Sequence, residues 1–304
     1  MEGGVGAAHA DVRAEVTTGK ARRLRAFREH LLAFPPLGWT VVFFVLPALI
    51  IILYSLGEID PLTYQVRFGW TLDNYAQIWD GLYREAIVRS LLLAFASTVG
   101  CLLLGFPVAY FMALQESRLQ RILLVAIIVP FWTSFIVRTY AWVNALADNG
   151  PLADLLRTVG LLEGRLGLLY TPFSVAIGLT TSYLPLMILP LYVALERMDP
   201  SLRNAAADLG ANARRTFRRV IIPLAAPGIV AGCLMVGIPS TGEFVVPAIL
   251  GGGKTTMYGN VVSDQFLKSG DYPFGAALAA AFMALLTIVL VLLRSRTRNL
   301  EELV

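Results

Sequence analysis

Histidine, cysteine and charged residues are all scarce in this sequence. It contains two histidines and two cysteines, and charged residues make up 15% of the chain. So few histidines and cysteines argue against a disulfide framework and against a metal cluster, and we predict no metal site. Because His9 and His30 both precede the first apolar stretch, no histidine embedded in the apolar part is available as a catalytic base. We therefore predict neither catalytic residues nor an enzyme.

Long apolar stretches are what the sequence has in abundance. Hydrophobic residues make up 57% of the chain, so it is more apolar and less charged than an average soluble domain. Six stretches reach about 20 residues, the length at which a helix crosses roughly 30 Å of hydrocarbon. They cover residues 37–56, 86–114, 119–146, 173–195, 220–240 and 275–293. The pattern predicts an all-α membrane protein with six transmembrane helices.

Lysine and arginine are distributed unevenly between the two sides of this topology. With the N-terminus inside, the inner segments hold 17 of the 25 basic residues and the outer loops hold six. Cytoplasmic loops retain positive charge during insertion, so we predict that both termini are cytoplasmic. The chain then divides into a tail over 1–36, a membrane domain over 37–293 and a tail over 294–304. Basic residues that flank apolar spans indicate a lipid environment and no nucleic-acid partner.

The predicted cytoplasmic loop over 196–219 contains a short amphipathic helix. Pro200 suits its first turn, and Gly210 suits a left-handed position at its end. Apolar residues recur between them at helical spacing, namely Leu202, Ala205, Ala206 and Leu209. A basic stretch then leads to Pro223, where the fifth span begins. Such a helix can dock in a partner's groove and transmit a push to that span, or it can be a solvated interfacial helix.

The loop resembles the coupling motif of ABC-importer permeases, in which E-A-A, a glycine and I-x-L-P follow at fixed spacing. Here the motif reads Asn204-Ala205-Ala206, Gly210 and Val220-x-Ile222-Pro223. Asn204 replaces the glutamate, so a charge contact at that position does not carry over. The resemblance assigns coupling to the partner ATPase to Leu202, Asn204, Ala205, Ala206, Asp208, Leu209, Gly210, Arg214, Arg215 and Pro223.

Three longer segments resemble the inner-membrane permeases of spermidine/putrescine importers. They are residues 130–142, 148–150 and 242–252, and the likeness runs from the first span to the sixth. It implies the type I ABC importer permease (MetI-like) fold, a bacterial inner-membrane location and a path for polyamines. It also implies a second permease subunit, two cytoplasmic ATPase subunits that carry ATP and Mg, and a periplasmic binding protein. No cofactor is expected on this chain itself.

Two charged residues lie within the apolar stretches and are candidates for the substrate path. An arginine near the centre of a span costs about 2.5–3.5 kcal/mol on insertion scales, so Arg138 should face protein or water. Its partner is predicted to be Glu243 or Asp148, or else it caps backbone carbonyls. Glu243 either attracts a cationic polyamine or closes a helix break beside Gly242.

Aromatic residues near the same segments are further candidates. The faces of Trp132, Tyr140, Trp142 and Tyr183 could hold alkylammonium groups by cation–π attraction. Each of them could equally lie in the aromatic belt at the lipid interface. Gly228 and Gly232 form a G-x-x-x-G pair in the fifth span, which favours close helix packing within the chain over a subunit interface.

Three other functions remain possible at this point. An importer of another small metabolite, such as an opine, an amino-acid-like compound or another cation, would have the same architecture. An ion-coupled secondary transporter would show internal repeats and an acid near the midplane. An intramembrane enzyme would need a nucleophile and a base facing each other within the spans. Association with an ATPase would separate the importers from the other two.

Overall fold

The computed structural model describes residues 35–301 apart from residues 61, 64 and 200, with side chains described as far as Val291. Most of the predicted N-terminal tail, including His9, His30 and its six basic residues, lies outside the described residues. The side chains of Arg294, Arg296 and Arg298 in the predicted C-terminal tail lie outside them as well.

Helices account for most of the described chain. The first is a continuous helix over Pro35–Ser55, in which a π-helical turn, η1 (Val41–Val45), precedes α2 (Leu46–Ser55). The remaining elements are β1 (Gly57–Ile59), β2 (Val66–Phe68), α3 (Asp73–Gln77), α4 (Gly81–Ala113), α5 (Ser117–Phe131), α6 (Phe135–Leu146), α7 (Pro151–Thr158), α8 (Pro172–Glu196), α9 (Ser201–Asp208), α10 (Ala213–Thr216), η2 (Phe217–Ile221), α11 (Ile222–Thr241), α12 (Val245–Leu250), α13 (Tyr258–Asp264), η3 (Gln265–Ser269) and α14 (Tyr272–Glu301).

Five helices in the described part are long and apolar enough to cross a membrane. They are Pro35–Ser55, Gly81–Ala113, Pro172–Glu196, Ala213–Thr241 and Tyr272–Val291. Two more helices, Ser117–Phe131 and Phe135–Thr158, are apolar enough only when taken together, and they are bent by 87° relative to each other, as in a broken span or a re-entrant loop. The six apolar stretches of the sequence therefore correspond to five straight spans and one bent pair.

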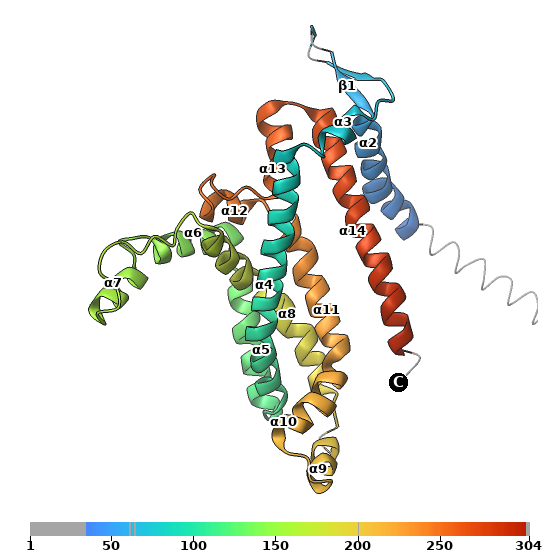
Figure 1. The fold of residues 1–304 in the computed structure, drawn as a ribbon. Helices are drawn as coiled ribbons and strands as arrows, with labels where there is room; N and C mark the ends of the chain where they lie inside the picture. Colours follow the sequence, from blue (N-terminus) through green and yellow to red (C-terminus); the bar gives the residue numbers. More distant parts are fainter. Residues whose placement is uncertain (1–34, 61, 64, 200, 302–304) are drawn as a thin grey trace, which may run out of the picture.

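The prediction of a single helix over residues 119–146 is wrong. Residues 132–134, called the first break below, separate α5 from α6. Pro130 lies one turn before the bend and has no amide hydrogen to donate, so the helical ladder is already weakened there. The hydroxyl of Thr133 then donates to the carbonyl of Pro130 at 2.7 Å, which closes the end of α5 locally. Beyond the break the chain changes direction, α6 lies beside α12, and α7 projects from the bundle (Figure 1).

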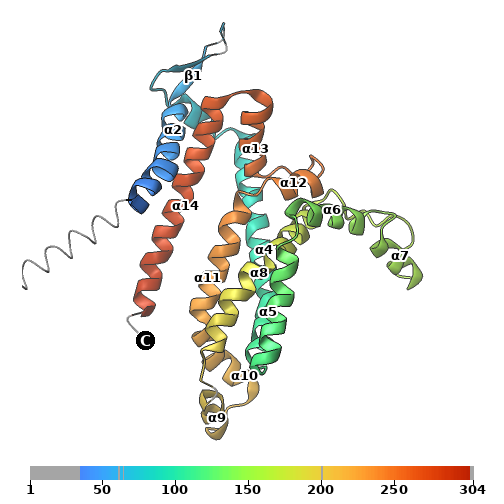
Figure 2. The same cartoon turned by 180° about the vertical axis from the view of Figure 1, so that it is seen from behind.

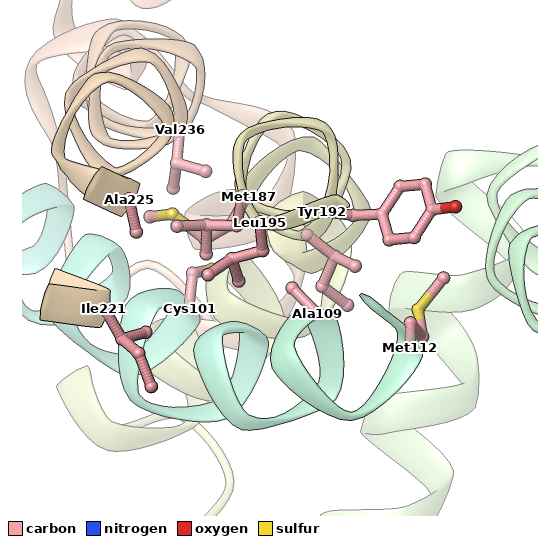
Figure 3. Close-up of a cluster of buried hydrophobic side chains, with 11 residues drawn as sticks. Cys101, Ala109, Met112, Met187, Tyr192, Leu195, Ile221, Ala225 and Val236 are labelled. Atoms are coloured by element: carbon pink, nitrogen blue, oxygen red, sulfur yellow. The ribbon is translucent and has the colours of Figure 1, made fainter. Parts of the chain in front are cut away.

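The core of the molecule is a bundle of α4, α8 and α11, each of which packs against the other two (Figures 1 and 2). Figure 3 shows the buried cluster between them, to which α4 contributes Cys101, Ala109 and Met112. From α8, Met187 and Leu191 are fully buried in the same cluster. The cluster places α8 at the centre of the bundle, between α4 and α11.

Glycines of α11 allow α8 to approach closely. A Cβ atom at Gly228 would lie 2.6 Å from Ala194 Cβ and 2.7 Å from the Pro190 carbonyl oxygen, and one at Gly232 would lie 2.6 Å from Met187 Sδ. At Gly228 a backbone oxygen is among the nearest atoms, so an added methyl group would require the helices to shift, whereas at Gly232 the flexible side chain of Met187 would have to move. The prediction that the glycine pair serves packing within the chain is confirmed.

A second group of helices stands beside this bundle. In both views α14 runs along α2, to one side of α11 (Figures 1 and 2). It joins α4 and α13 through a cluster that includes Tyr83 and Phe274, whose rings meet edge-on at 5.0 Å. The Tyr258 hydroxyl adds a hydrogen bond of 2.7 Å to the carbonyl of Leu278. The first and last spans are therefore attached to the bundle near the start of α14.

The strands β1 and β2 form an antiparallel hairpin beyond the end of α2, with Gly57 opposite Phe68. Asn74 of α3 fixes the base of this hairpin, because its Nδ2 donates to the carbonyls of Ser55 and Gly57 at 3.0 and 2.8 Å. The hairpin marks the end of the molecule away from α9 (Figure 1).

Candidate functional site

The segment predicted to couple to an ATPase, residues 199–223, forms one end of the molecule (Figure 1). Within it α9 packs against α10 and η2. The apolar residues Leu202 and Leu209 are 42% and 88% exposed, so the chain itself does not cover them. Most of the predicted coupling residues are exposed as well, including Asn204, Ala205, Asp208, Arg214 and Arg215, whereas Ala206 is half-buried.

Local hydrogen bonds define both ends of α9. At its start, Asp199 Oδ1 accepts a hydrogen bond of 2.8 Å from the Ser201 amide. Hydrogen bonds from the backbone and the side chain of Ser201 lower the pKa of Asp199 from its ordinary value. At its end, Gly210 has φ +75°, and the amides of Gly210 and Ala211 donate to the carbonyls of Ala207 and Ala206. This is a Schellman motif, and it confirms the left-handed position predicted for Gly210.

The second half of the segment is continuous with the next span. Asn212 caps α10 by accepting a hydrogen bond of 2.9 Å from the Arg215 amide. The helix then runs through η2 into α11, and Pro223, near the start of α11, follows this π-helical turn. Phe217 packs edge-on against Phe106 of α4 at 5.5 Å. α9 therefore lies in the chain between two core helices, α8 before it and α11 after it.

Arg138 caps backbone carbonyls at the first break. Its Nη2 donates to the carbonyls of Phe131 and Thr133 at 3.1 and 3.2 Å, and its Nη1 makes a longer hydrogen bond of 3.5 Å to the carbonyl of Ser182 in α8. The guanidinium also lies 5.7 Å from the centre of the Phe131 ring. Of the two interpretations drawn from the sequence, carbonyl capping is confirmed.

The predicted ion pairs of Arg138 are wrong. Within the described part of the chain, Arg138 forms no salt bridge with Glu243 or Asp148. Asp148 instead organises the loop after α6, because its side chain accepts from the Gly167 amide at 2.9 Å and its carbonyl accepts from Arg157 at 2.7 Å. The guanidinium has several N–H donors in a planar fork, so Arg138 can satisfy several carbonyls at the bend. These hydrogen bonds take the place of the predicted ion pair.

Glu243 lies at a second interruption of the helices, residues 242–244, called the second break below. Its Oε1 accepts hydrogen bonds from the amides of Phe244 and Val245 at 3.0 and 2.8 Å, and so satisfies two backbone donors at the start of α12. Its Oε2 accepts a hydrogen bond of 2.6 Å from the Tyr183 hydroxyl of α8. The structure brings together two predicted site residues, and it gives Glu243 the role of an acid that closes a helix break.

The remaining aromatic candidates have different surroundings. Trp132 and Tyr140 are 80% and 54% exposed, so their ring faces are available to lipid or to a substrate. Trp142 is half-buried and packs against the cluster that contains Leu179 and Leu250. It contributes to packing, and the described structure does not bring it to Glu243.

Asn260 is a polar residue of this region that sequence reasoning missed. Its Nδ2 donates to the carbonyl of Phe244 at 2.7 Å, and its Oδ1 accepts from the Met257 amide at 3.1 Å. The side chain therefore ties α13 to the second break. The signal available in the sequence was an amide residue within the mostly apolar run 257–262, and nothing local pointed to its partner.

A known protein family matches the part of the chain that contains these residues. Residues 105–298 match the model of the family described as binding-protein-dependent transport system inner membrane component. The chain belongs to this family. It is therefore a multi-pass inner-membrane protein and a transport component, which sets aside the intramembrane enzyme and the ion-coupled transporter. The family match contains both breaks and the coupling segment.

Individual relatives of this permease are similar along almost their full length. It is 41% identical over 265 residues to the spermidine/putrescine transport system permease protein PotB of Salmonella typhimurium, covering 87% of this chain and 92% of the relative. PotB of Escherichia coli is 40% identical over 87% of this chain and 96% of its own length.

A solved structure has the same fold. The chain superposes with a TM-score of 0.68 on a bacterial ABC transporter involved in the import of the acidic polysaccharide alginate, over 90% of this chain and 96% of that one. At 15% identity, this likeness shows the fold alone, which is that of an ABC-importer permease as the sequence predicted.

Proposed function

We propose that this chain is a permease subunit of an ATP-driven importer of polyamines such as spermidine and putrescine. The observation that carries the proposal is 41% identity to a spermidine/putrescine permease along 87% of the chain. A similarity of this length includes both breaks and the coupling segment. It therefore goes beyond the apolar pattern that any permease shares.

The assembly that we propose follows from the surfaces of the chain. The exposed apolar residues Leu202 and Leu209 fit docking of α9 into a groove of a cytoplasmic ATPase subunit. ATP and Mg bind to two such subunits, and this chain binds neither. A second permease subunit completes the path, and a periplasmic binding protein delivers the substrate at the end that carries the β1–β2 hairpin.

Within the path, exposed aromatic faces are the groups best suited to alkylammonium ions. Trp132 at the first break and Tyr140 in α6 are both more than half exposed, and cation–π attraction to such rings is worth about 0.5–2 kcal/mol depending on desolvation. We propose them as substrate contacts. The other four candidates, Trp142, Tyr183, Arg138 and Glu243, serve packing and the two breaks instead.

Reconstituted transport tests the substrate. The chain is co-expressed with its neighbouring transporter subunits, placed in liposomes and supplied with binding protein and labelled putrescine or spermidine. Saturable uptake that disappears without ATP supports a polyamine importer. ATPase assembly without polyamine uptake keeps the importer and overturns the substrate, and competition by other small cations or amino-acid-like compounds then identifies the class that is carried.

Cysteine labelling tests the orientation. Cys101 and Cys233 are replaced by serine, and one cysteine is introduced at Arg67 in the hairpin or at Asn204 in α9, both of which are exposed. An impermeant maleimide applied to intact cells should label position 67 and should reach position 204 only after permeabilisation. The reverse pattern would place α9 outside and exclude its docking to a cytoplasmic ATPase.

A further inference from the structure

The middle of α8 contacts both breaks at two consecutive residues. The carbonyl of Ser182 accepts the long hydrogen bond from Arg138, which closes the first break. The hydroxyl of the next residue, Tyr183, donates to Glu243, which closes the second break. The two breaks lie about a hundred residues apart in the sequence, yet both are hydrogen-bonded to adjacent residues of α8.

Each of the two charged side chains also holds its own break together. Nη2 of Arg138 binds the carbonyls of Phe131 and Thr133. Oε1 of Glu243 binds the first amides of α12, at Phe244 and Val245. One end of each side chain therefore fixes the local bend, and the other end fixes the position of that bend relative to α8.

The helices that follow the two breaks are also in contact. α6 packs against both α12 and α8, so the two bent segments and α8 form one packed unit. Phe135 is the first residue of α6, and the centre of its ring lies 6.5 Å from the centre of the Tyr183 ring. A displacement of α8 cannot leave either break where it was unless these contacts are broken.

α8 leads from this level directly to the coupling segment. Tyr183 and the last residue of α8, Glu196, are separated by about 20 Å of helix at 1.5 Å per residue. α8 packs along α4 and α11, and the loop that carries α9 follows its last residue.

We propose that Arg138 and Glu243 are positioning residues which, through Ser182 and Tyr183, make both breaks follow the movement of α8 when the ATPase moves α9. The inference rests on the proposed function in one respect, the docking of α9 to an ATPase. The carboxylate of Glu243 is already stabilised by three donors, so it needs no ammonium group of the substrate. The polyamine is recognised elsewhere, and Glu243 acts on transport through α8.

The decisive experiment compares Tyr183→Phe, Glu243→Gln and Arg138→Lys in the reconstituted full importer. Tyr183→Phe removes only the donor to Glu243. Gln at 243 loses the charge but keeps one acceptor oxygen for the two amides, and its NH2 group can donate to the tyrosine oxygen, so a hydrogen bond to Tyr183 can still form with the direction reversed. Lysine at 138 keeps the charge but cannot bind several carbonyls as the arginine fork does. Thr181→Val is the matched control, because the Thr181 hydroxyl donates at 2.9 Å to Ile177 of the same helix.

The readouts are the KM for polyamine uptake and the number of polyamines imported per ATP hydrolysed. We expect Tyr183→Phe and Arg138→Lys to lower import per ATP by about tenfold or more, the effect of a lost hydrogen bond to a charged group, with KM unchanged. Glu243→Gln and Thr181→Val should keep import per ATP within about twofold of the wild type.

Two results would overturn the proposal. A large rise in KM for Glu243→Gln, with Tyr183→Phe unaffected, would make Glu243 a contact for the substrate. Unchanged import per ATP in both Tyr183→Phe and Arg138→Lys would show that the ties to α8 carry no coupling. Failure of the proposed function is distinguishable from either result, because the wild type itself would then import no polyamine.

Discussion

The coupling segment and the middle of α8 are stabilised in opposite ways. α9 is held by its own caps, with Leu209 88% exposed, whereas the middle of α8 is surrounded by α4, α11 and the two breaks. A surface that the chain leaves uncovered contributes little to folding, and a closely packed one contributes much. Changes on α9 should therefore affect transport without affecting stability, and changes in the packing of α8 should do the reverse.

The largest effect on transport is expected from the exposed face of α9. Ala205→Gln places a long side chain in the face formed with Leu202 and Leu209, and we expect uptake to fall more than about tenfold because ATPase docking is a packed contact. The unfolding free energy should change by less than about 0.5 kcal/mol, since Ala205 is exposed. Uptake in liposomes and thermal unfolding of the isolated permease measure the two quantities.

Ala207→Gln is the control for this prediction. Ala207 is also exposed but lies two residues further along, on the opposite side of the helix. It should keep uptake within about twofold of the wild type. Equal losses from both substitutions would mean that the orientation of the docking face is wrong.

A second prediction reverses the pattern at the interface of α8 and α11. An alanine at Gly228 meets Ala194 Cβ at 2.6 Å, whereas one at Gly237 of the same helix has its nearest neighbour, Thr98 Oγ1, at 3.4 Å. Both substitutions gain the helix propensity of alanine, so their difference isolates the clash. Gly228→Ala should be less stable than Gly237→Ala by about 1–3 kcal/mol. Equal unfolding temperatures in detergent would contradict the close packing of α8 on α11.

The sequence predicted the locally stabilised α9 better than the breaks around α8, whose contacts come from distant segments. α9, Gly210 and Pro223 were predictable because periodicity, a left-handed glycine and a proline in the first turn are local signals. The first break was missed because residues on both sides of it are apolar, and hydropathy measures composition and not direction. Pro130 was the available warning. The partners of Arg138 and Glu243 depend on how three distant segments meet, which one sequence does not state.

A third and smaller effect concerns Asn204, which stands where the family motif has a glutamate. Its side chain is exposed and neutral, so any hydrogen bond to the ATPase is of the ordinary kind, worth about 0.5–1.5 kcal/mol. Asn204→Ala should weaken ATPase binding by about two- to tenfold, measured as the affinity of the purified ATPase for the permease in nanodiscs. A loss of more than about a hundredfold would show that the amide has the importance of the missing carboxylate.

The smallest effect is expected at the start of α9, from the titration of Asp199. Hydrogen bonds from Ser201 lower the pKa of this carboxyl below its ordinary value of 3.8, so the cap is fully present above that value and is lost only as the pH falls through the lower pKa. Hydrogen exchange of the α9 amides, expressed as protection factors, should therefore be constant between about pH 8 and 5. Asp199→Asn, which keeps an acceptor, should match the wild type over this range, and Asp199→Ala should exchange faster at Ser201 throughout. Protection that declined from pH 7 to 5 in the wild type but not in Asp199→Asn would mean that the pKa of the carboxyl is raised above its ordinary value instead of lowered, and that α9 begins differently from the cap described above.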